Sequence, residues 1–227
     1  MDARAQDRLR IAVAWRAAGA EAKRAEEIAP GYDTAHGVAV LRDNGVRPHQ
    51  TLEALAKLRP VFEKGNRHCH RREFFADYRW RSGLVDWNRG CREQPWPRNR
   101  LAPFEASPTR AAIPGEWGLG PVYAIERLLE RLHVTIEDAE LVEINEAFAA
   151  QVLAVLRKLK DEGIGEISDE RLNVNGGAIA LGHPVGASGA RLVLTALKEL
   201  QRRNARGGPR QSVRGGGQGA ALWLERL

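Results

Sequence analysis

A histidine in a glycine-rich turn is the residue of this chain with the clearest capacity for chemistry. His183 lies between Gly182 and Pro184, in a segment over residues 173–184 that reads as a short strand followed by a glycine turn. An imidazole titrates near neutral pH, so it can accept and return a proton during a reaction. Glycine lets the main chain approach a ligand closely. Because a lone histidine in a turn is most often only a solvated residue, the neighbouring segments must decide its role.

Two other segments could contribute to the same chemistry. Asn145 opens the run Asn-Glu-Ala-Phe-Ala, which follows an apolar stretch, and Gly215, Gly216 and Gly217 begin a run of four glycines and one glutamine. A fixed carboxamide can orient a water or stabilise a developing oxyanion. The glycine run alone is typical of a flexible turn. We therefore treat the three segments as a candidate site only in combination.

The cysteines and the remaining histidines do not form a convincing metal motif. Cys69 stands between His68 and His70, and Cys91 lies far away in the sequence. Zinc ligands are usually two to four residues apart and occur in two pairs. We therefore predict no metal site. Two cysteines also make no disulfide framework, so a cytoplasmic location is expected.

The elements that must position the candidate residues alternate between helices and strands. Apolar side chains recur every three or four residues in the helical segments, whereas short apolar runs indicate buried strands. The expected elements after residue 118 are helices over 121–132, after 145 and from about 188 to 200, a capped turn over 135–138, and strands over 141–144 and 220–224. This alternation predicts an α/β fold. Further upstream, residues 3–28 and 51–59 read as helices, and residues 38–41 read as a short strand.

Composition restricts the class of protein. The 227 residues are 43% hydrophobic and carry a net charge of +6, enough for one large domain or two modest ones. No run approaches the roughly 20 apolar residues of a membrane helix, and no secretory signal is evident. The positive charge raises the idea of an anionic cofactor or nucleic acid. Much of it is arginine between residues 67 and 110, without a helical stripe, so a nucleic-acid partner is not expected.

The segment over residues 67–117 differs from the rest of the chain. It has four of the six tryptophans, both cysteines and no sustained helical or strand period. Five prolines interrupt any regular element. The chain therefore divides into a helical part over residues 1–66, an irregular segment over 67–117 and an ordered part over 118–227.

Taken together, the three candidate segments resemble the signature of the thiolase family. Residues 145–149, residues 173–189 and residues 215–219 occur in the family's order, and residues 51–62 resemble its middle region. The resemblance implies the C-terminal half of a thiolase, a layered mixed sheet with helices, with the N-terminal half of the family fold missing. It also implies transfer of an acyl group between coenzyme A and the α-carbon of acetyl-CoA, or the reverse cleavage of a 3-ketoacyl-CoA, as in fatty acid metabolism. Coenzyme A thioester would be the substrate, and no other cofactor is expected.

The resemblance assigns a role to each candidate residue. His183 matches the histidine that activates the nucleophilic cysteine thiol, and Asn145 matches the residue that orients a water in the oxyanion hole. Phe148 matches an apolar wall near the pantetheine arm. Gly182 and the glycines at 215–217 would allow the main chain to approach the thioester. The expected partners are an acyl-CoA and either a second copy of the chain or a complementary thiolase half.

Departures from the family pattern point to impaired activity. Neither Cys69 nor Cys91 has the surroundings of the family's nucleophile, and Val213 stands where the family has its acid/base cysteine. A valine cannot exchange a proton. The chain is therefore either an impaired thiolase-type acyltransferase or a non-catalytic module that binds acyl-CoA or a thiolase partner.

Two interpretations remain open for residues 67–117 and 207–214. Their sequences fit translation from a shifted reading frame in a GC-rich gene, with the frame restored afterwards, and they equally fit true divergence of the protein. Resequencing the coding DNA distinguishes the two.

Overall fold

The computed structural model describes the backbone of residues 27–41, 104–106, 110–111, 117–203, 210–214 and 218–224. The predicted helices over residues 3–28 and 51–59 lie almost wholly outside these residues. Cys69, Cys91 and the glycines at 215–217 also lie outside them. Among the described helices, none combines the length and the apolar composition that a membrane span requires.

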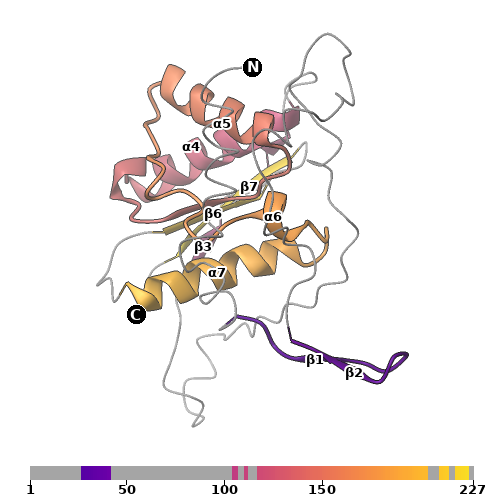
Figure 1. Ribbon diagram of the computed structural model, residues 1–227. Coiled ribbons are helices and arrows are strands. Elements are labelled where there is room, and N and C mark those ends of the chain that lie inside the picture. Colours follow the sequence, from indigo (N-terminus) through magenta and orange to yellow (C-terminus); the bar gives the residue numbers. More distant parts are fainter. Residues whose placement is uncertain are drawn as a thin grey trace, which may run out of the picture.

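A mixed β-sheet forms the centre of the molecule (Figure 1). Strand β5 (Val142–Ile144) pairs in parallel with β6 (Arg210–Arg214), and β6 pairs antiparallel with β7 (Gln218–Leu224). Two short strands, β3 (Phe104–Ala106) and β4 (Arg110–Ala111), also pair antiparallel with β7. A parallel crossover such as that from β5 to β6 requires a long connection, and here the helices supply it.

Helices cover both faces of this sheet. Helices α4 (Gly120–Leu132) and α5 (Ala149–Asp161) lie on one face, and α7 (Ser188–Arg202) lies on the other (Figure 1). A short 3₁₀ turn, η3 (Trp117–Leu119), leads into α4. The arrangement confirms the α/β class predicted from the alternation of helices and strands.

Each face of the sheet has its own hydrophobic core. Between the sheet and helices α4 and α5 lie buried side chains that include Val122, Ile125, Leu128, Val142, Ile144, Val155 and Trp223. A smaller cluster beneath α7 consists of Leu141, Ala196, Leu197, Leu200 and Leu224. Because side chains alternate along a strand, Val142 and Ile144 face the first core and Glu143 between them must face α7. A charged residue is thereby placed inside the smaller core.

Local sequence explains where the regular elements start and stop. Pro121 occupies the first turn of α4, and His133 ends this helix in the left-handed conformation at φ 55°. The predicted capped turn is the 3₁₀ helix η4 (Ile136–Asp138). The Asp138 carboxylate accepts from the Thr135 amide at 2.7 Å and from the Thr135 hydroxyl at 2.9 Å. These hydrogen bonds to the ionised form lower the pKa of Asp138.

A β-hairpin extends away from the layered body. Strands β1 (Gly31–Asp33) and β2 (Val38–Val40) pair antiparallel, and β2 confirms the strand predicted over residues 38–41. The turn between them is closed by Asp33, which accepts from the Ala35 amide at 2.9 Å and from a ring nitrogen of His36 at 2.8 Å. Figure 1 shows this hairpin in indigo, on the side of the molecule where α7 lies.

Three local predictions differ from the structure. Residues 178–181 form a four-residue helix, α6 (Ala178–Leu181), so His183 follows a short helix rather than a strand. The helix predicted at the Asn-Glu-Ala-Phe motif begins only after it, at Ala149, because Phe148 is still extended at φ −147°. Strand β6, and strands β3 and β4 within the segment described as irregular, were not predicted. Strands β3 and β4 pair with β7, and β6 pairs with β5, so each has a partner that is distant in sequence.

Candidate functional site

Asn145 stands at the carboxyl end of β5, directly after the last paired residue of the strand. The residue is 2% exposed. Its side-chain oxygen Oδ1 is buried and has no hydrogen-bond partner among the residues that the structure describes. A buried acceptor without a partner costs on the order of 1–3 kcal/mol. Such groups are unusual in a stable core and are a reason to look for a functional site.

Asn173 connects the segment that precedes His183 to the end of β5. Its main-chain amide donates to the Val142 carbonyl at 2.8 Å. Its side-chain oxygen accepts from the Ile144 amide at 2.6 Å, and its side-chain nitrogen donates to the Ile144 carbonyl at 2.9 Å. The carboxamide thus replaces the backbone of a neighbouring strand at Ile144. Residue 173 adopts a left-handed φ of 44°, which asparagine tolerates better than most residues.

The Glu146 carboxylate lies between the two segments that carry the candidate residues. One oxygen accepts from the Asn173 side-chain nitrogen at 3.0 Å, and the other accepts from the Ile179 amide in α6 at 3.0 Å. Glu146 follows Asn145 in the chain, and α6 leads directly to Gly182 and His183. The Glu146 side chain therefore links the loop bearing Asn145 to the short helix that leads to His183.

His183 is half-buried and its ring is held by Ser188, the first residue of α7. The ring nitrogen Nδ1 lies 2.6 Å from the Ser188 hydroxyl oxygen, and that hydroxyl donates to the Pro184 carbonyl at 3.1 Å. A hydroxyl has one proton, so both contacts are hydrogen bonds only if Nδ1 carries the proton and donates it to Ser188. In the neutral ring, Nε2 is then the nitrogen that can accept a proton.

Gly182 supplies a backbone shape that the turn before His183 requires. It ends α6 at φ 95°, in the region that favours glycine, and its amide donates to the Ala178 carbonyl at 2.8 Å. A side chain at this position would strain the turn. The position of His183 relative to α6 therefore depends on this glycine.

The other predicted site residues are placed in part. Phe148 is half-buried at the N-cap of α5, at the far end of the loop that starts with Asn145. Gly215, Gly216 and Gly217 lie outside the described residues, between β6 and β7. The parallel register pairs Val213 with Ile144, the residue before Asn145. Val213 and Asn145 therefore stand at the same edge of the sheet, although they are 68 positions apart in sequence.

A buried pair of a carboxyl group and a guanidinium lies beneath this edge. The fully buried Glu143 faces α7, where its carboxylate is 3.9 Å from the guanidinium of Arg191, and the two side chains are 0% and 7% exposed. Neither carboxylate oxygen and neither terminal nitrogen of Arg191 has a hydrogen-bond partner within the described residues. Burial raises the pKa of Glu143 to about 8, against the opposing effect of Arg191. Burial therefore favours the protonated form of this carboxyl group.

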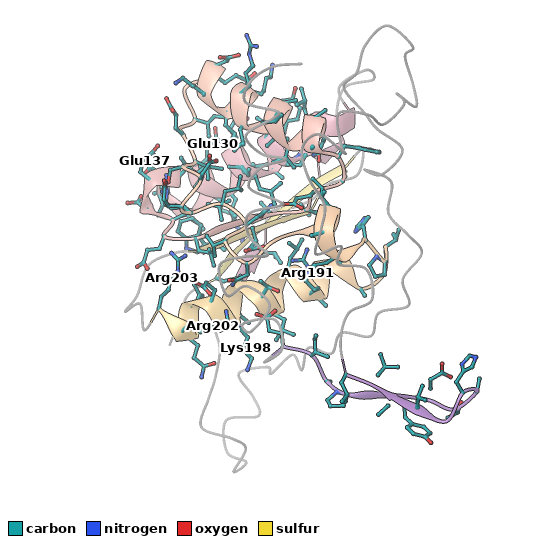
Figure 2. All side chains as sticks on the ribbon, viewed as in Figure 1. Glu130, Glu137, Arg191, Lys198, Arg202 and Arg203 are labelled. Carbon is teal, nitrogen blue, oxygen red and sulfur yellow. The ribbon has the colours of Figure 1, made fainter. Side chains whose placement is uncertain are left out.

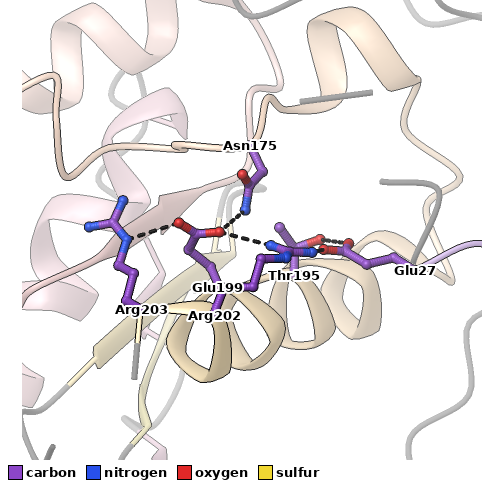
Figure 3. A network of polar contacts seen from close by, with 6 residues as sticks. All are labelled: Glu27, Asn175, Thr195, Glu199, Arg202 and Arg203. Carbon is purple, nitrogen blue, oxygen red and sulfur yellow. Dashed lines mark hydrogen bonds and ion pairs between the residues drawn. The ribbon is translucent and has the colours of Figure 1, made fainter. Parts of the chain in front are cut away.

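A second buried carboxylate, at the other end of α7, has a full set of partners (Figure 3). Glu199 accepts from Asn175 at 2.9 Å, from Arg202 at 2.8 Å and from Arg203 at 2.9 Å. Arg202 also donates to Glu27 at 2.9 Å, and Glu27 accepts from the Thr195 hydroxyl at 2.8 Å. This Glu199 network joins three distant segments, because Glu27 precedes β1 and Asn175 lies in the loop before α6.

Sequence reasoning missed several residues that shape the site. Glu146 and Ser188 lie inside the motifs that identified the candidates, but no contact was predicted for either of them. Their positions could have indicated a role, because Glu146 follows Asn145 directly and Ser188 lies five residues after His183. The signal from Glu143 and Arg191 was weaker. Glu143 is a charged residue type at a core position of a strand, and Arg191 is a buried charged residue on α7.

The model of the "Thiolase, C-terminal domain" family matches residues 99–226, more than half of the chain. The chain belongs to the thiolase family. The match contains all three segments that indicated this family in the sequence. The thiolase assignment, and with it the predicted fold of a thiolase C-terminal portion, is therefore confirmed.

Individual thiolases agree with this assignment. The chain is 40% identical to beta-ketoadipyl-CoA thiolase of Pseudomonas putida over 98% of its own length. It resembles the crystal structure of Bacillus anthracis acetyl-CoA acetyltransferase with a TM-score of 0.78 and 31% identity, over 100% of this chain. It also resembles human mitochondrial 3-ketoacyl-CoA thiolase with a TM-score of 0.74 and 33% identity, over 98% of this chain.

The chain spans about half the length of these thiolases. It covers 55% of the Pseudomonas putida protein, 57% of the Bacillus anthracis chain and 53% of the human chain. The two loops joined by Glu146 thus belong to the C-terminal portion of a thiolase fold. The division at residues 66 and 117 stays a prediction.

Proposed function

We propose that the site at the carboxyl edge of the sheet serves thiolase-type acyl transfer on acetyl-CoA and 3-ketoacyl-CoA. The observation that carries this proposal is the His183 ring, which Ser188 orients so that Nε2 can accept a proton. The chain belongs to a family whose relatives bear the names of such enzymes. Coenzyme A thioester is the substrate, and we propose no further cofactor.

In thiolytic cleavage, a thiolate adds to the 3-keto carbon of the substrate and forms a new carbon–sulfur bond. The bond between the second and third carbons then breaks, and its electron pair takes up a proton to give acetyl-CoA. Coenzyme A thiol finally attacks the remaining thioester and regenerates the first thiol. His183 would accept the thiol proton, since an adjacent base increases the thiolate fraction.

Asn145 would act on the oxygen that becomes negative during this addition. The resemblance assigns to it the orientation of a water, and its buried Oδ1 without a described partner supports a polar role at the site. A fixed dipole is most valuable where water is excluded. Phe148, Gly182 and the glycines at 215–217 would shape the space for the pantetheine arm and the thioester.

The chain by itself is proposed to be impaired in catalysis. Val213 stands at the position of the acid/base cysteine, and the register places it beside the end of β5. Neither of the two cysteines of the chain lies in the sequence surroundings of the family's nucleophile. Loss of an activated nucleophile removes at least ~10³-fold of the rate in comparable enzymes.

Thiolysis of acetoacetyl-CoA by the purified chain tests this proposal. We expect turnover no faster than that of the His183→Ala variant, because neither Cys69 nor Cys91 matches the family's nucleophile. Turnover that is lost in His183→Ala would show that the chain is itself a working thiolase and would contradict the impairment.

A second candidate function is binding of acyl-CoA without turnover, which is favoured by a valine at residue 213, where the family has its acid/base cysteine. Calorimetric titration with coenzyme A distinguishes binding without turnover from catalysis. Heat of binding that is reduced in Phe148→Ala, together with the absence of thiolysis, would support a binding module. No heat at millimolar coenzyme A would contradict both functions for the chain alone.

A further inference from the structure

The Glu146 carboxylate has a place in the site that the family resemblance did not assign. Its two oxygens accept from different segments, one from the Asn173 side chain and one from the Ile179 amide, both at 3.0 Å. Asn173 is in turn paired to both backbone groups of Ile144, the residue before Asn145. Glu146 therefore closes a ring of contacts that includes the end of β5, the loop after it and the start of α6.

The packing around this carboxylate is tight. A Cβ added to Gly177 would overlap the Glu146 carboxylate, whereas the backbone of Gly177 is extended and open to any residue at φ −141°. The glycine is therefore explained by the space that the carboxylate occupies and not by backbone strain. The Glu146 carboxylate therefore packs directly against the turn at Gly177.

Helix α6 depends on a contact from outside itself. It has only four residues, and its N-cap Gly177 has no side chain that could accept from the first amides. Isolated helices of this length are not stable in water. The Glu146 carboxylate supplies the acceptor for Ile179, so it contributes directly to the one turn of helix that precedes Gly182 and His183.

We propose that Glu146 is a positioning residue, which holds the turn bearing His183 in register with the loop bearing Asn145. The proposal rests on the proposed function for the importance of that register, while the contacts themselves are independent of it. A carboxylate suits this task because both of its neighbours are donors. A glutamine would turn its own amide group toward one of them, and two donors facing each other lose a hydrogen bond.

The variant Glu146→Gln tests the proposal without requiring turnover. Amide hydrogen exchange of Glu146→Gln is compared with that of the wild-type chain and of the control variant Glu130→Gln. The control makes the same chemical change at an exposed position of α4. We expect exchange of amides in residues 177–183 to rise at least ~10-fold in Glu146→Gln, because a local opening loses a hydrogen bond to a charged group. Exchange in α5 and in residues 192–200 of α7 should change less than threefold.

The ring of His183 provides the second readout. Its imidazole nitrogen–proton signals in NMR should move or broaden in Glu146→Gln and stay in place in Glu130→Gln. Unchanged ring signals with unchanged exchange in residues 177–183 would overturn the proposal. An equal rise in exchange across α5 and α7 would also overturn it, because that result indicates only a general loss of stability.

The variant Gly177→Ala keeps the carboxylate and displaces it by the added methyl group. We expect the same local rise in exchange over residues 177–183 as in Glu146→Gln. Coenzyme A titration of the unchanged chain separates the two proposals. Absence of binding there contradicts the proposed function, whereas a local response to Glu146→Gln would still establish the positioning contact.

Discussion

Two buried carboxylates lie near opposite ends of helix α7, Glu143 of β5 beside Arg191 and Glu199 in the helix itself, and their surroundings differ. Figure 2 labels Arg191 near one end of this helix and Arg202 and Arg203 at the other. Glu199 has three donors within 2.9 Å. Among the described residues, Glu143 has no hydrogen-bond partner, and the guanidinium of Arg191 is 3.9 Å away, too far for a hydrogen bond. Both carboxylates are buried, so the difference between them lies in the number of hydrogen-bond donors within reach.

The difference follows the location of each carboxylate. Glu199 faces the loop of Asn175 and the segment of Glu27. Asn175 supplies a donor to Glu199, and Glu27 binds Arg202, which in turn binds Glu199. Glu143 projects from the middle of β5, where neighbouring strands have already used their backbone donors. At this position desolvation is the largest effect on the Glu143 carboxyl group, and desolvation favours the neutral form.

The largest effect is expected from removing the well-paired carboxylate. Glu199→Ala should lower the free energy of unfolding by about 3–5 kcal/mol, because Arg202 and Arg203 lose their buried partner. Urea denaturation measures this change. The matched control is Glu162→Ala, which breaks the more exposed pair with Lys158 and should cost less than about 1 kcal/mol. Equal losses in the two variants would show that the Glu199 network adds little.

A smaller effect, visible mainly as pH dependence, is expected from Glu143→Gln. The pKa of Glu143 is raised from 4.5 to about 8 in the folded state. Between these values the folded protein binds a proton that the unfolded chain has released. This contribution to stability is complete below about pH 4.5 and is lost as the pH rises through 8, by about 1.4 kcal/mol per pH unit.

Unfolding of both proteins at pH 5.5 and pH 7.5 tests this expectation. In Glu143→Gln the fall in stability between the two pH values should be smaller by about 2–3 kcal/mol, since a glutamine does not titrate. Glu130→Gln, on an exposed position, should leave the slope unchanged. An identical slope in Glu143→Gln and the unchanged chain would mean that Glu143 stays ionised beside Arg191.

The smallest of these effects is expected at the outer member of the Glu199 network. Glu27→Gln keeps an acceptor for either Arg202 or Thr195 but loses the charge, so we expect a loss of about 1 kcal/mol. The loss should shrink in 0.5 M salt, because the pair is partly exposed. Arg157→Ala, in an exposed pair with Asp161, should cost less than about 0.5 kcal/mol. A larger loss there than in Glu27→Gln would contradict the ranking.

Much of the fold could be read from local patterns. The apolar spacing of residues 121–132 and 188–200 predicted α4 and α7, and the Thr135–Asp138 cap predicted η4, because helix faces and caps depend on residues close in sequence. The motifs at residues 145–149, 173–189 and 215–219 predicted the thiolase family in the same way. The sequence alone thus determined the fold class and the family, whereas the roles of Asn145 and His183 stay predictions.

The tertiary structure decided the contacts that join these residues. Glu146 meets Ile179 across 33 positions, Glu143 meets Arg191 across 48, and Arg202 meets Glu27 across 175. Strand β6 and helix α6 also depended on distant partners, namely β5 and the Glu146 carboxylate. Local periodicity contains no information on which segments meet, because that choice depends on burial and pairing summed over the whole chain. The raised pKa of Glu143 and the placement of His183 follow from these long-range contacts.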